Sequence, residues 1–202
     1  AGKSTSKSTY WILENIVNYQ RTFGKHSILF TGLYSAEENE SESLSAGSFG
    51  FANDLLLYNY LSAGATYDPP YSDANRTALQ SIMGRFQYGF NDRYLLTLTV
   101  RRDGYSAFGK DHKFGNFPSA AIAWRIEQED FMKNLPSISQ LKLRLSYGKN
   151  GNQAISPYSS QAKLSMSTNP YAFGDRLKVV YGYYPSTIAN SRLGWESTAT
   201  SN

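Results

Sequence analysis

The sequence predicts an all-β fold: an antiparallel segment of a membrane-spanning β-barrel, containing about eight strands. Three observations favour this architecture. Apolar and polar residues alternate with a period of two, the segments that do so are about as long as a tilted membrane strand, and short and long connections alternate along the chain. The whole range 1–202 is therefore expected to form one partial β-barrel domain.

The clearest alternating segment is 141–147. Successive side chains of a strand point to opposite faces, so only a strand separates its apolar residues from its polar ones. The apolar face carries Leu141, Leu143, Leu145 and Tyr147, and the opposite face carries Lys142, Arg144 and Ser146.

The same period recurs in earlier segments, and each is predicted to be a strand. A further strand is expected to begin near 195, and the stretches 158–167 and 177–184 are candidates for a hairpin. The earlier segments are, in chain order, 9–20, 26–36, 78–90, 93–102 and 117–127.

The connections indicate which end of the sheet faces which compartment. Residues 21–25 and Asn91-Asp92 are short turns. The ranges of about 37–76, 103–115 and 150–194 are rich in polar residues and are expected to be long outer loops. Short turns on one side and long loops on the other are typical of outer-membrane barrels.

Four basic residues occupy the polar face of four consecutive predicted strands. An arginine on the lipid face near the bilayer midplane would cost ~2–4 kcal/mol, so this face is expected to line the lumen. A plug-facing role is expected for three of the four, Arg85, Arg125 and Arg144, and lumen solvation is the alternative. The four lumen-facing candidates are Arg85, Arg101, Arg125 and Arg144.

Composition and motifs argue against several other functions. The net charge of +4 is spread along the chain rather than gathered in a stripe, so nucleic acid is not an expected partner. Cysteine is absent, and His26 and His112 have no partners at metal-ligand spacing. We found no catalytic constellation, so the sequence predicts neither an enzyme nor a cofactor or metal site.

The aromatic residues have two interpretations. Those near strand ends are expected to form a girdle at the membrane interface. Those in the predicted loops are candidates for stacking on a substrate such as a sugar. These loop aromatics are Tyr67, Tyr71, Tyr158, Tyr183 and Tyr184.

Two other architectures are compatible with the alternation. One is a soluble β-sandwich that binds carbohydrate, in which two apolar faces pack together. The other is a self-contained small barrel, although the chain stops inside a predicted strand.

Motifs in 93–153 are more specific. Residues 93–104 are followed by Phe108-Gly-Lys110, Phe117-Pro-Ser119, Ala123-Trp-Arg125 and Phe131-Met-Lys133. Residues 141–148 and Gly151-Asn-Gln153 complete the series. In order and spacing, this region resembles the barrel of SusC/RagA-type TonB-dependent outer-membrane transporters of Bacteroidetes. Ala107 stands where that family commonly has a basic residue.

The resemblance implies a barrel of ~22 strands, of which this chain would supply roughly a third without the plug domain or the closing strands. It implies import of oligosaccharides or peptides across the outer membrane. The implied partners are a SusD-like surface lipoprotein acting as a lid, TonB acting through the plug, the glycan or peptide substrate, and the lipid bilayer.

Overall fold

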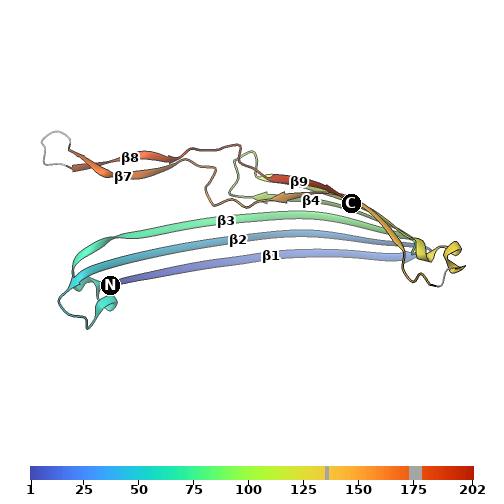
Figure 1. Cartoon of the computed structure of the whole chain (residues 1–202), viewed down its shortest axis with the longest axis horizontal. Helices are drawn as coiled ribbons and strands as arrows, with labels where there is room; N and C mark the ends of the chain where they lie inside the picture. Colours follow the sequence, from blue (N-terminus) through green and yellow to red (C-terminus); the bar gives the residue numbers. More distant parts are fainter. Residues whose placement is uncertain (135–136, 173–178) are drawn as a thin grey trace. The chain divides into compact units, whose positions relative to one another are not determined.

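The computed structural model describes residues 1–134, 137–172 and 179–202, and it confirms the all-β antiparallel fold (Figure 1). Short 3-10 helices occur at η1 (Leu57–Asn59), η2 (Leu61–Ala63), η3 (Ile126–Gln128) and η4 (Asp130–Asn134). None of the helices in these ranges is long and apolar enough to cross a membrane. The strands are β1 (Gly2–Phe23), β2 (His26–Phe51), β3 (Gly64–Phe90), β4 (Tyr94–Tyr105), β5 (Phe114–Arg125), β6 (Lys142–Asn152), β7 (Lys163–Ala172), β8 (Val179–Thr187) and β9 (Glu196–Ser201).

Seven strands form one sheet in the order β1-β2-β3-β4-β5-β6-β9, and β7 and β8 form a separate two-stranded sheet. The predicted hairpin is thus present as β7 and β8, although residues 177 and 178 of its second stretch lie outside the described ranges. The large sheet has two edges, β1 and β9, and is not closed over the described residues. An unpaired edge is not tolerated in lipid, so the open sheet fits a segment of a larger barrel.

Both predicted short turns are present. Asn91 and Asp92 each have a φ of +53°, and Gly24 between β1 and β2 has a φ of +58°. A type I′ hairpin turn, whose twist matches that of the flanking strands, requires a positive φ at both of its central residues. Asn and Asp tolerate this conformation better than other side chains do, which explains why a turn without glycine forms there.

The expectation of a long loop at 37–76 is wrong in its secondary structure. β2 continues to Phe51 and β3 starts at Gly64, so only 52–63 connects them. Polar residues can form a strand when both of its faces meet water. The hydrogen bonds between neighbouring strands pair the backbone N–H and C=O groups whatever the side chains are. The chain divides into two compact units, one comprising 1–13 and 37–78 and the other 14–36 and 79–202.

The other two predicted loops are also shorter than expected. The connection between β4 and β5 is 106–113, and the range 150–194 includes the end of β6 together with β7 and β8. Residues 173–178 of that range lie outside the described part of the chain.

The register confirms the two-faced sheet. Leu96 on β4 pairs with Ile122 on β5, which pairs with Leu145 on β6. One residue further, Thr97, Ala121 and Ser146 form the matching row on the opposite side. We call these the apolar face and the polar face. The apolar face is open, with Ile122 53% exposed, so the fold requires something apolar to cover it.

The small buried core lies where the β4–β5 connection meets the segment before β9. Phe108 is 2% exposed, and its ring lies 5.2 Å from that of Trp195, which is also 5.2 Å from Phe117. The Trp195 indole donates a hydrogen bond to the Lys113 carbonyl. A side chain at Gly109 would collide with the Ser191 carbonyl, so glycine permits this close approach.

Candidate functional site

Aromatic rings form a continuous row across the apolar face at its short-turn end. Phe23 and His26 stack at 5.3 Å, and His26 lies 5.0 Å from Phe90. Phe90 and Tyr94 follow at 6.4 Å, and Tyr94 and Trp124 at 6.5 Å. We call this row the aromatic belt. Its place at the end of an apolar surface matches the interfacial girdles of membrane barrels.

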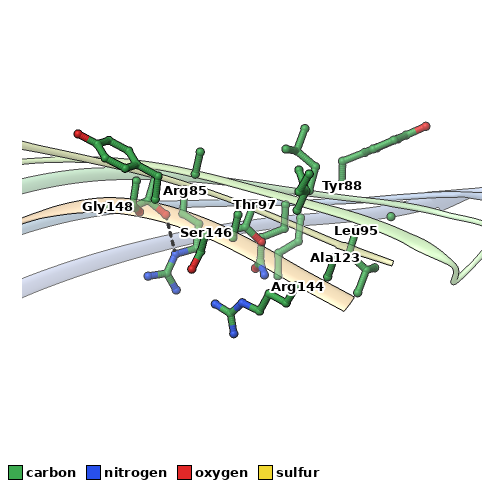
Figure 2. Close-up of a pocket in the computed structure, with 18 of the residues that line it drawn as sticks. Arg85, Tyr88, Leu95, Thr97, Ala123, Arg144, Ser146 and Gly148 are labelled. Atoms are coloured by element: carbon green, nitrogen blue, oxygen red, sulfur yellow. Dashed lines mark hydrogen bonds between the residues drawn. The ribbon is translucent and has the colours of Figure 1, made fainter. Parts of the chain in front are cut away.

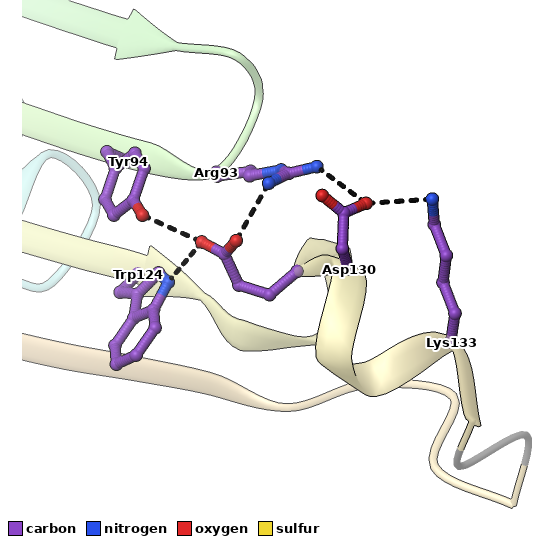
Figure 3. Close-up of polar contacts among 6 residues, drawn as sticks. Arg93, Tyr94, Trp124, Asp130 and Lys133 are labelled. Atoms are coloured by element: carbon purple, nitrogen blue, oxygen red, sulfur yellow. Dashed lines mark hydrogen bonds and ion pairs between the residues drawn. The ribbon is translucent and has the colours of Figure 1, made fainter.

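Glu129 ties the aromatic belt to the connection after β5 (Figure 3). Its carboxylate accepts hydrogen bonds from Trp124 Nε1 at 3.0 Å and from Tyr94 Oη at 2.8 Å. It also pairs with Arg93 Nη1 at 2.8 Å. The bonds from Trp124 and Tyr94, followed by the charge of Arg93, hold the pKa of Glu129 below its usual value. The polar tips of two belt residues are thereby directed toward the turns.

Three further ion pairs strengthen this turn network. Asp130 contacts Lys133 at 2.8 Å and Arg93 at 3.5 Å. Arg125 pairs with Glu127 at 3.0 Å and donates to the Asp92 carbonyl. The β3–β4 turn and the helices η3 and η4 are therefore joined by charge-assisted hydrogen bonds.

The polar face carries an open cavity of about 780 Å³. Figure 2 shows Arg85 and Arg144 projecting from one side of the sheet, with Tyr88 on the other. Arg85 Nε donates to Thr99 Oγ1 at 3.3 Å, and Lys142 lines the same cavity. Within the described ranges, no ion pair with an acidic residue is recorded for Arg85, Lys142 or Arg144. We call these three residues the cationic row.

The other two predicted arginines are already paired. Arg101 contacts Asp103 at 2.8 Å and donates to Ser81, and both of these partners are buried. It lines a separate cavity of about 510 Å³ together with Phe117 and Trp195. Arg125 is held by Glu127, as described above. Only Arg85 and Arg144 of the four candidates therefore share one cavity and offer charge without a recorded acidic partner.

The predicted loop aromatics do not all lie in loops. Tyr67 and Tyr71 belong to β3, and Tyr183 and Tyr184 belong to β8, so the loop assignment is wrong for these four. Tyr183 pairs with Met166 and Tyr184 with Ser165, which places the two rings on opposite faces of the hairpin. Tyr158 lies in a turn with a φ of +61°. A role in binding substrate remains a prediction for all five.

Two residues that the structure makes prominent are not among the site residues predicted from the sequence, although the alternation already placed Lys142 on the polar face. Lys142 shares the parity of Arg144, so the period that identified Arg144 also contained the signal for Lys142. Glu129 gave no such signal, because its three donors come from the β3–β4 turn and from two different strands.

Comparison with known proteins identifies the family. Residues 2–199 match the model described as "TonB dependent receptor-like, beta-barrel". The chain belongs to the TonB-dependent receptor family and forms part of its β-barrel. This confirms the SusC/RagA-type resemblance, and it replaces both the β-sandwich and the self-contained small barrel as accounts of the fold.

Relatives of this TonB-dependent receptor segment are much longer than the chain. TonB-dependent receptor P3 of Formosa agariphila is 38% identical over 192 residues, covering 95% of this chain and 19% of the relative. TonB-dependent receptor SusC of Bacteroides thetaiotaomicron is 41% identical over 132 residues, covering 64% of this chain and 13% of SusC. The structure of the RagAB peptide transporter matches with a TM-score of 0.82 and 26% identity, covering 98% of this chain and 21% of the matched one. The chain thus spans about a fifth of the length of P3 and of the matched RagAB chain.

Proposed function

We propose that the chain is barrel wall in a TonB-dependent importer that carries oligosaccharides or peptides across the outer membrane. The observation that carries this proposal is the two-faced sheet: an exposed apolar face bounded by the aromatic belt, with the cationic row on the opposite face. The apolar face of such a sheet can meet lipid while its polar face meets a water-filled or plugged lumen.

The proposed substrate class follows the relatives. The resemblance to SusC/RagA-type transporters implies oligosaccharides or peptides, and one matched structure is that of the RagAB peptide transporter. Substrate choice is expected to reside in the variable outer segments, including Tyr67, Tyr71, Tyr158, Tyr183 and Tyr184. Aromatic side chains there offer stacking surfaces for sugars and apolar contacts for peptides.

The proposed partners have separate roles. A SusD-like surface lipoprotein covers the outer opening, TonB acts on the plug domain from the periplasmic side, and the bilayer covers the apolar face. The protein acts by transport rather than catalysis, and the proposal requires no cofactor.

The cationic row is proposed to pair with acidic groups of the plug domain. Arg85, Lys142 and Arg144 project into one cavity without a recorded acidic partner, and unpaired charge next to a packed plug would be costly. Arg101 and Arg125 face the lumen in the same proposal but are neutralised locally by Asp103 and Glu127.

The experiment that tests the function is fractionation of the source cells with an antibody to the 106–113 connection. We expect a heat-modifiable outer-membrane band several times heavier than 22.6 kDa. Deletion of its gene should abolish growth on one glycan or peptide source and not on simple sugars or amino acids. A soluble band near 22.6 kDa would overturn the proposal.

A further inference from the structure

At the end of the sheet opposite the aromatic belt, two strand positions on the apolar face are occupied by basic residues. Arg102 follows Leu98 and Val100 along β4 and pairs with Asn116 on β5. Lys149 follows Tyr147 along β6 with the same parity and pairs with Ala199 on β9. These positions interrupt an otherwise apolar surface, so their charge requires an explanation.

Two cations line one cavity of about 450 Å³, and a third lies against its wall. Lys149 and Arg192 line it, together with Asn116, Phe114 and one carboxylate, Asp111. The Arg102 guanidinium lies 4.8 Å from the centre of the Phe114 ring, which is part of the cavity lining, and a cation over an aromatic face is attracted to it. We call Arg102, Lys149 and Arg192 the outer cation cluster. In the part of the chain that the structure describes, no ion pair is recorded for any of its three members.

The outer cation cluster lies at the height expected for a membrane interface. A strand rises ~3.3 Å per residue, so a strand tilted by ~35–45° climbs roughly 20 Å between Tyr94 and Arg102. The apolar band of a membrane barrel is ~25 Å tall. With the aromatic belt at one boundary of the bilayer, Arg102 therefore lies close to the other.

We propose that this cavity binds the phosphate group of an outer-leaflet lipid, with the acyl chains lying along the apolar face. Clustered cations at a membrane boundary attract anionic lipid headgroups. The apolar side chains of Val100 and Tyr147 lie beside the cluster members Arg102 and Lys149, so headgroup and chains would be bound on one continuous surface. This inference rests on the proposed function, because it requires the apolar face to meet lipid with the long connections outside.

The test uses the full-length protein, purified in neutral detergent and stripped of lipid. Phosphorylated lipid A is the probe, and bound lipid per protein is measured by mass spectrometry. The triple variant Arg102→Gln, Lys149→Gln, Arg192→Gln should bind it about tenfold more weakly or worse, because charge-assisted contacts to phosphate are lost. A control with the same change in charge, Lys3→Gln, Lys7→Gln, Lys163→Gln, should bind within about twofold of the natural protein.

Two further arms separate the possible sources of phosphate. Dephosphorylated lipid A should bind the natural protein as weakly as phosphorylated lipid A binds the triple variant, and inorganic phosphate should not displace the bound lipid. Undiminished binding by a triple variant that keeps its heat-modifiable fold would overturn the inference. Equal binding of dephosphorylated lipid, or displacement by inorganic phosphate, would also overturn it.

Failure of the inference can be told apart from failure of the proposed function. A chain that is not a membrane barrel would show no heat-modifiable band and would bind neither form of lipid A. If the triple variant does not fold, the comparison of the two lipid forms on the natural protein decides the matter.

Discussion

Trp124 Nε1 lies 3.0 Å from Glu129 Oε1, so a belt residue at the end of β5 is fixed by the connection that follows the strand. Tyr94, on the neighbouring strand, donates to the same oxygen at 2.8 Å. One carboxylate therefore aligns two aromatic side chains whose rings stack 6.5 Å apart. Glu129 therefore couples the orientation of these two belt residues to the geometry of the connection after β5.

This coupling predicts a pH-dependent contribution to stability. The pKa of Glu129 is lowered in the folded protein by the Trp124 and Tyr94 hydrogen bonds and by Arg93. Its contribution is therefore fully present above the unfolded carboxyl pKa of about 4.3, and it is lost as the pH falls through the lower folded pKa.

Glu129→Gln should accordingly lower the denaturant midpoint at pH 7, and the difference from the natural protein should shrink at pH 3. Unfolding in liposomes at the two pH values measures this, with Glu14→Gln on β1 as the control. A difference that is the same at both pH values would contradict the role given to the Glu129 charge.

If the apolar face meets lipid, the cost in stability of introducing an arginine should differ strongly between adjacent residues of one strand, because their side chains point to opposite faces. Ala120→Arg should destabilise the protein by ~2–4 kcal/mol, because Ala120 lies four residues from the belt residue Trp124 and the charge would enter lipid near the midplane. Ala121→Arg, one residue away and facing the polar cavity, should cost under about 1 kcal/mol. Equilibrium unfolding in lipid bilayers compares the two, and equal costs would show that the faces are wrongly assigned.

The buried cluster around Trp195 predicts a second large effect. Phe108→Ala should destabilise the folded protein by ~3–5 kcal/mol, because the ring is 2% exposed and its removal leaves a cavity. Phe131→Ala removes a ring that is 59% exposed and should stay within about 0.5 kcal/mol. Denaturant midpoints give both values. A small loss for Phe108→Ala would mean that the β4–β5 connection is not anchored as described.

The cationic row predicts an effect on plug seating and transport. Arg85→Glu and Arg144→Glu should each lower substrate uptake by about tenfold or more, because an acidic side chain there would repel the acidic groups of the plug. The plug should also become more sensitive to protease. Lys163→Glu, an exposed cation on β7, is the matched control. Normal uptake with a protected plug in both variants would favour simple solvation of the row in the lumen.

Much of the sheet could be predicted because its signal is local. The alternation at 141–147 and 93–102 identified β6 and β4 and the correct faces, since the period of two is a property of the strand itself. The Asn91-Asp92 turn was predictable for the same reason: its chemistry lies in two adjacent residues.

What could not be predicted depends on pairing between distant segments. The polar ends of β2 and β3 look like loop in isolation, and they form strands because their backbones are paired in the sheet. Likewise, Arg101 and Arg144 are alike in sequence pattern, and only the structure shows that Asp103 neutralises the first. Trp195 and Phe108 meet across a long stretch of intervening chain, and no local pattern indicates that contact.

The most direct test of the central claim is site-directed spin labelling along β5, with one cysteine at a time from 118 to 124 in the full-length protein in lipid bilayers. Residues 1–202 contain no cysteine, and any cysteine elsewhere in the full-length protein is first replaced by serine. We predict that accessibility to oxygen dissolved in the lipid alternates with a period of two and is highest at Ala120, Ile122 and Trp124. Uniform accessibility, or maxima at Ser119, Ala121 and Ala123, would contradict the assignment of the apolar face to lipid.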